Sequence, residues 1–130
     1  MNELKILLAN DRNRFRPSET LKGVAGCRLP AAPRNADVRL FWYTRGKGTE
    51  DVGVINRFAF EQPQAEEGRP FQFVLPEEPY SFSGRLVSLI WALELVVEPG
   101  SQTTRLEFTL SPTGEEILLH ADAQVHARSR

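Results

Sequence analysis

Several features that would point to a particular chemistry are scarce in this chain of 130 residues. A single cysteine, Cys27, cannot form a disulfide within the chain, and this favours a reducing, cytoplasmic setting. No uncharged apolar run approaches the ~20 residues that a membrane-spanning helix needs. The first residues also lack the basic-then-apolar pattern of a secretion signal. We therefore expect neither secretion nor direct insertion into a membrane.

Excess charge of one sign is also missing, because 16 basic and 17 acidic residues leave a net charge of −1. No overall field therefore attracts nucleic acid. The two signs are unevenly distributed: residues 1–50 hold ten basic and five acidic residues, whereas residues 51–130 hold six and twelve. This asymmetry has two interpretations. Either interleaved strands give a mixed solvated surface, or one sheet carries a basic face.

What the chain does contain is a repeated alternation of apolar and polar residues with a period of two, which is typical of half-buried strands. Seven segments show it: residues 4–8, 21–29, 38–45, 52–60, 71–75, 89–97 and 106–110. The prolines lie between or at the ends of these segments, and residues 98–101 (EPGS) have the composition of a tight hairpin turn. The sequence predicts an all-β fold, an antiparallel immunoglobulin-like β-sandwich of about seven strands over residues 1–112. Residues 113–130 are expected to form a C-terminal tail, as an edge strand, a short helix or a partly disordered segment.

The predicted register places two indole rings, Trp42 and Trp91, between the sheets. The second segment offers small residues on its inner face, Gly23, Ala25 and Cys27, which would leave room for both rings. Cys27 is accordingly interpreted as a small core residue rather than a reactive thiolate. In the fourth segment the period predicts one shared face for Val52, Val54, Phe58 and Phe60.

Two stretches of sequence resemble the arrestin family. Residues 15–24 (FRPSETLKGV) are similar to the opening of that family, an aromatic residue followed by proline, glycine and glutamate, then an apolar residue and a glycine before the second strand. Residues 71–76 (FQFVLP), 79–84 (PYSFSG) and 89–93 (LIWAL) resemble a later run of the family. The resemblance covers about residues 4–110. It implies an arrestin-like sandwich and a non-enzymatic adaptor that binds other proteins, often membrane cargo or receptors.

The chain also departs from that family. Full arrestins contain two such sandwiches, whereas this sequence has the length of one, so the charged cluster between two domains cannot form within it. The paired lysines of the receptor-phosphate sensor are missing, since Lys5 stands alone. Recognition of phosphorylated receptors is therefore not implied.

Catalysis and metal binding find little support in the pattern. The only two histidines, His120 and His126, both lie in the tail, so a hydrolytic triad is poorly supported and no enzyme is predicted. On a strand, His120, Asp122 and His126 would share one face and form a weak candidate metal site. The same pattern is typical of a solvated edge strand or an amphipathic tail, and a metal site needs more convergent ligands. We expect no cofactor and no metal.

The strongest candidate site for a partner lies in the third segment. If Trp42 points inward, Phe41 and Tyr43 point outward, and the candidate partner-binding residues are Arg39, Phe41, Tyr43, Arg45 and Lys47. Aromatic and arginine side chains are enriched in the energetic centres of protein interfaces. The alternative is that a helix over residues 115–128 covers the two outward rings.

Together these observations predict a cytoplasmic, arrestin-like adaptor or scaffold that binds a protein partner, including membrane-associated proteins. An open sandwich has sheet edges, so a homodimer through one edge is also expected. The alternative function is a lectin-type sandwich in which aromatic side chains stack on a sugar. The candidates for that role are Trp42, Tyr43, Tyr80 and Trp91.

Overall fold

The computed structural model describes residues 2–46, 50–84, 87–113 and 115–119. In this part of the chain lie ten strands and a short 3-10 turn: β1 (Glu3–Leu8), η1 (Ala9–Asp11), β2 (Arg14–Phe15), β3 (Thr20–Arg28), β4 (Asn35–Gly46), β5 (Val52–Ala59), β6 (Glu66–Val74), β7 (Phe82–Gly84), β8 (Val87–Glu98), β9 (Gln102–Leu110) and β10 (Ile117–Leu119). The predicted all-β sandwich is confirmed, and its seven segments correspond to the seven long strands. Within these ranges, no helix has the length and apolar character needed to cross a membrane.

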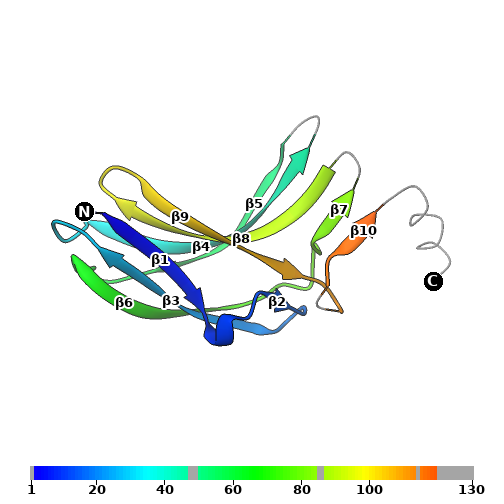
Figure 1. Cartoon of the computed structure of the whole chain (residues 1–130), viewed down its shortest axis with the longest axis horizontal. Coiled ribbons are helices and arrows are strands. Elements are labelled where there is room, and N and C mark those ends of the chain that lie inside the picture. Colours follow the sequence, from blue (N-terminus) through cyan, green and yellow to red (C-terminus); the bar gives the residue numbers. More distant parts are fainter. Residues whose placement is uncertain (1, 47–49, 85–86, 114, 120–130) are drawn as a thin grey trace.

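The strands form two packed sheets (Figure 1). The smaller sheet has the order β1-β3-β6, and all its pairings are antiparallel. The larger sheet has the order β10-β7-β8-β4-β5, and β9 joins it beside β8. One end of the larger sheet bends away from the smaller sheet, so that β5, β7 and the ends of β4 and β8 extend past it (Figure 1).

The central strand of the larger sheet is β8, which pairs with β4 along its whole length. On its other side β8 changes partner: it pairs with β9 over Trp91–Val97 and with β7 at Ser88 and Leu89. β9 then continues to a parallel pairing with β2, and β7 pairs in parallel with β10. The predicted hairpin turn at residues 98–101 does join β8 and β9. The sheet therefore forks beside residue 90.

The core is built from the inner faces of both sheets. Trp91 is fully buried and packs near Phe108, with ring centroids 6.0 Å apart. Its indole N–H donates a hydrogen bond to the carbonyl oxygen of Pro79 at 2.7 Å, so burial leaves no unpaired donor. The inward position predicted for Trp91 is confirmed.

A β-bulge changes which face the residues of β5 occupy. The register against β4 shifts between Leu40 and Phe41, which leaves Ile55 without a partner of its own. One extra residue reverses the alternation of a strand. Val52 and Val54 therefore lie on the outer face and are exposed, whereas Phe58 and Phe60 pack against the core. The prediction that these four residues share one face was wrong.

The room for Trp42 also comes from a different strand than expected. Trp42 is half-buried at the edge of the core, and a Cβ atom added to its cross-strand neighbour Gly53 would lie 2.3 Å from the indole. Gly53 therefore permits this ring to lie across β5. At Gly23 of β3, by contrast, an added Cβ would lie 2.7 Å from the ring of Phe71. The neighbouring strand β6 therefore already fills the space over Gly23 with the Phe71 ring.

The tail begins with a strand. Ile117–Leu119 form β10 beside β7, and not the first turn of a helix. The backbone N–H of Ile117 donates to the carbonyl of Ser81 at 3.3 Å. Residues 120–130 lie outside the described part of the chain.

The turn before β3, which carries the first arrestin-like stretch, is held by Glu19. Its carboxylate accepts hydrogen bonds from the backbone N–H of Arg16 at 2.6 Å and from the guanidinium of Arg12 at 2.5 Å. Ser18 has a positive φ of 69°, and its hydroxyl donates to Glu77. The hydrogen bond from the Arg16 backbone, followed by that from Arg12, holds the pKa of Glu19 below its ordinary value.

We expect Trp91→Ala to lower the free energy of unfolding by ~3–5 kcal/mol, because it removes a fully buried ring and leaves a cavity. A urea titration followed by circular dichroism measures the change. A loss below about 1 kcal/mol would contradict the central place of this side chain.

We expect Glu19→Gln to lower the free energy of unfolding at pH 7 by about 1 kcal/mol, since a neutral amide accepts these hydrogen bonds less strongly and the site is partly exposed. The pKa of Glu19 is lower in the folded than in the unfolded chain. Its stabilising contribution is therefore present above the unfolded pKa and is lost as the pH falls through the folded pKa. Urea titrations at a series of falling pH values should show a gap between variant and wild type that is full at pH 7 and narrows as the solution becomes acidic. A gap that stays the same size at every pH would contradict the role of the carboxylate charge.

Candidate protein-binding face

Four of the five predicted partner-binding residues, Arg39, Phe41, Tyr43 and Arg45, occupy alternate positions of β4. Phe41 and Tyr43 are paired with Val54 and Val52 of β5, which project from the outer surface of the larger sheet. The predicted outward direction of Phe41 and Tyr43 follows from this register. Lys47 lies outside the described residues.

Phe41 and Tyr43 form a stacked pair with ring centroids 6.0 Å apart and an interplanar angle of 29°. The guanidinium of Arg105, from β9, lies 5.0 Å from each centroid, and that of Arg45 lies 5.6 Å from the Tyr43 ring. Such cation–π contacts hold the cations against the rings. We name Arg39, Phe41, Tyr43, Arg45 and Arg105 the arginine–aromatic face.

The exposure of Phe41 is smaller than an outward position suggests. Only 6% of this side chain is accessible, because Tyr43 stacks beside it and Arg105 lies over it. The small side chain of Ala92, its neighbour on β8, leaves space for the ring. The cover is thus part of the sheet itself, and the expected cover by a helix from the tail is absent at residues 117–119, which form β10.

Every arginine of the face has a carboxylate partner. Arg39 pairs with Asp37 at 3.0 Å and Arg105 with Glu94 at 3.3 Å. Arg45 pairs with Glu107 at 3.2 Å and donates a hydrogen bond to the Tyr43 hydroxyl at 2.7 Å. The Tyr43 hydroxyl in turn donates to Glu107 at 2.5 Å. The surface is therefore charge-balanced, which favours the interpretation of a mixed surface over that of a basic face.

An open hollow of about 380 Å³ lies beside the stacked rings. Phe41, Tyr43, Val52 and Val54 supply its apolar lining, and arginine and glutamate side chains surround them. The two valines are 64% and 63% exposed. The sequence does not reveal that the valines and Arg105 belong to this face, because their placement depends on the bulge in β5 and on the register of β9.

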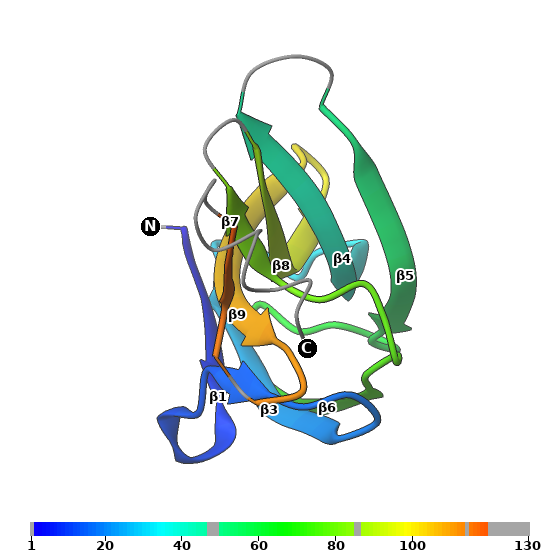
Figure 2. The ribbon, with the colours of Figure 1, turned by 90° about the vertical axis from the view of Figure 1, so that its right-hand side faces the viewer.

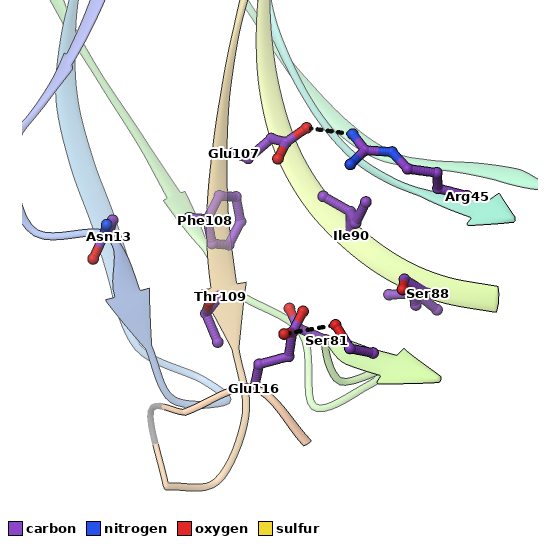
Figure 3. Close-up of a pocket in the computed structure, with 11 residues that line it drawn as sticks. Asn13, Arg45, Ser81, Ser88, Ile90, Glu107, Phe108, Thr109 and Glu116 are labelled. Carbon is purple, nitrogen blue, oxygen red and sulfur yellow. Dashed lines mark hydrogen bonds and ion pairs between the residues drawn. The ribbon is translucent and has the colours of Figure 1, made fainter. Parts of the chain in front are cut away.

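A second hollow, of about 250 Å³, lies at the fork of the larger sheet (Figure 3). It is mainly polar: Ser83 donates a hydrogen bond to Glu116 at 2.7 Å, and Ser81 accepts one from the backbone N–H of Leu110 at 2.9 Å. Glu107 and its partner Arg45 line the same hollow (Figure 3). These contacts tie the segment before β10 to the sandwich, so we assign the hollow a structural role.

The structure brings no metal ligands together among the residues that it describes, since they contain no group of three or more His, Cys, Asp or Glu side chains suited to a metal ion. The weak candidates His120, Asp122 and His126 lie outside those ranges.

The aromatic residues named for sugar stacking are differently placed. Trp91 is fully buried and cannot contact a ligand at the surface. Trp42 packs against the core and over Gly53, and Tyr43 is engaged with Phe41, Arg45 and Glu107. Neither tryptophan thus offers the open, flat ring face that stacking on a sugar needs.

Cys27 is half-buried on β3, and its Sγ lies 3.4 Å from the carbonyl oxygen of Gln64. Burial raises the pKa of the Cys27 thiol, and the neighbouring Glu67 carboxylate adds to the increase. Such a thiol is the reverse of an activated nucleophile.

We expect alkylation of Cys27 by iodoacetamide at pH 8 to be at least several-fold slower in the folded protein than in urea, because less thiolate is present and the sulfur is partly covered. The rate in the folded protein should rise at a higher pH than the rate in the unfolded chain. Mass spectrometry of quenched samples measures both rates. Faster alkylation of the folded chain would contradict the raised pKa.

Known proteins share the fold of this chain, but the comparisons assign it to no family. No protein-family model matches the chain, and no curated protein matches its sequence. Among solved structures, the sporulation control protein Spo0M of Bacillus subtilis superimposes with a TM-score of 0.62 at 18% identity, over 85% of this chain and 49% of that one. The chain thus shares the arrestin-like sandwich of Spo0M and spans about half of that protein's length.

Two other solved structures align with TM-scores too low to carry an argument about fold. A CARDB domain from Pyrococcus furiosus gives 0.43 at 9% identity, over 92% of this chain and 94% of that one. The DNA glycosylase AlkC of Pseudomonas fluorescens gives 0.34 at 13% identity, over 84% of this chain and 30% of that one.

Proposed function

We propose that this chain is a non-enzymatic protein-binding module, an arrestin-like adaptor that holds a partner protein on its arginine–aromatic face. The observation that carries the proposal is the stacked pair of Phe41 and Tyr43 under Arg105, beside a hollow with exposed valines. Tyrosine and arginine are, together with tryptophan, the residue types most enriched among the residues that dominate the energy of a protein interface.

The arrangement of the face suits binding because its side chains are held in place before a partner arrives. Tyr43 is fixed by Glu107 and Arg45, and Arg105 is fixed by Glu94 and the two rings. Side chains that are already ordered lose little conformational entropy on association. The remaining apolar contact comes from Val52 and Val54, which are open to solvent.

The balance of charge on the face limits the class of macromolecule that it suits. Because carboxylates lie beside all three arginines of the face, a polyanion such as nucleic acid would meet as much repulsion as attraction. The face suits a protein with an apolar centre and charges of both signs around it. The arrestin-like fold supports an adaptor role in the cytoplasm with a membrane-associated protein as partner, and no cofactor is needed for it.

The experiment is affinity capture from the native cell with two matched charge reversals. Arg105→Glu places a carboxylate over the rings and beside Glu94, which should reduce the captured partner at least tenfold, a loss of about 1.4 kcal/mol or more. Arg28→Glu is the control, since Arg28 also pairs with a carboxylate, Glu66, but lies on the smaller sheet. Captured proteins are quantified by mass spectrometry.

Both variants are first compared with wild type by urea titration, so that a loss of binding is not a loss of folding. Capture that is unchanged in Arg105→Glu, or reduced equally in the two variants, would contradict the assignment of the binding face.

A further inference from the structure

The outer edge of β5 is open. β5 is the last strand in the order of the larger sheet, and in the described part of the chain no strand pairs with its far side. Figure 2 shows it as the outermost strand, beside β4. An edge of this kind presents backbone groups that another strand can pair with.

The direction of these backbone groups follows from the hydrogen bonds of the β4–β5 pair. The N–H of Thr44 donates to the carbonyl of Asp51 at 2.9 Å, so Thr44 and Asp51 form a hydrogen-bonded pair. Hydrogen-bonded and non-hydrogen-bonded pairs alternate in an antiparallel ladder. Val52, opposite Tyr43, therefore points its N–H and C=O away from β4 and toward the open edge.

The side chains along this edge leave it unprotected. Residues 52–56 (VGVIN) contain no charge and no proline, and Val52, Val54 and Ile55 are all substantially exposed. Edges of natural sheets are usually guarded by charged residues or proline. The edges of the smaller sheet follow that rule: β1 carries Glu3 and Lys5, and β6 carries Pro70.

Charges of opposite sign lie at the two ends of this uncharged stretch. Glu50 and Asp51 precede it, and Arg57 follows it with a side chain that is largely exposed. When two identical strands pair in antiparallel fashion, the beginning of each meets the end of the other. The acidic end of one copy would then lie beside Arg57 of the other, and symmetry repeats the contact at both ends.

We propose that two copies of this chain pair edge to edge through β5 in antiparallel fashion, which joins their larger sheets into one continuous sheet. The bulge at Ile55 confines the backbone ladder to the region of Val52–Val54, so the valines and the charged ends supply much of the interaction. In this arrangement both arginine–aromatic faces lie on the same side. This last consequence rests on the proposed function and would make the dimer bivalent.

The experiment is sedimentation equilibrium of the full chain from micromolar to near-millimolar concentration. Wild type should show a monomer–dimer equilibrium. Val52→Lys with Val54→Lys should weaken the association at least tenfold, because lysines would crowd together at the edge. Val24→Lys with Val74→Lys adds the same charge to exposed valines of the smaller sheet and should leave the association unchanged.

A charge exchange tests the antiparallel direction. Glu50→Lys with Asp51→Lys, and separately Arg57→Glu, should each weaken the dimer, and the triple variant should recover most of it. Circular dichroism and urea titration show that each variant is folded.

Wild type that remains monomeric throughout would overturn the proposal, as would a triple variant that stays weaker than both of its parents. Failure here is distinguishable from failure of the proposed function. If the chain is monomeric but its capture of a partner still depends on Arg105, the proposed binding face is supported and only the dimer is contradicted.

Discussion

The structure depends on β8, a strand with both faces covered. Its inner face buries Trp91, whose indole N–H is paired with the Pro79 carbonyl, and its outer face buries Ala92 and Val96. A strand in this position needs partners along both edges, and β4 supplies one edge completely. The other edge is divided between β9 and β7, and this division produces the fork and the bend of the larger sheet. The arginine–aromatic face lies on the outer side of this same strand and its neighbours.

The chemistry of that face is decided by pairing and not by net charge. Arg105 contacts two rings and one carboxylate, and Arg45 contacts Tyr43 and Glu107. Ion pairs at a surface contribute little to stability by themselves. Their effect here is to hold the aromatic pair in place and to balance the positive charge of the arginines. In the function that we propose, shape and apolar contact then select the partner. The unguarded edge of β5 begins at the border of this face, where Val52 belongs to both surfaces.

The prediction for β5 was wrong because alternation along a strand reports the face of a residue only while the register is unbroken. A single unpaired residue, Ile55, turned Val52 and Val54 outward, although the period placed them on one face with Phe58. Phe41 was predicted to point outward and does so, but it is covered by Arg105, which is distant in sequence. No local pattern could reveal that contact, because it depends on how β9 aligns with β8.

The sequence by itself determined the class of fold, the seven long strands, the turn at residues 98–101 and the inward position of Trp91. These follow from short-range rules: the period of two along a strand, the backbone conformations that proline and glycine prefer, and the burial of large aromatic rings. Only the tertiary structure decided which residues meet on the outer face and which edge remains open. Those features depend on registers and a bulge set by contacts between distant strands, and local residue preferences do not encode them.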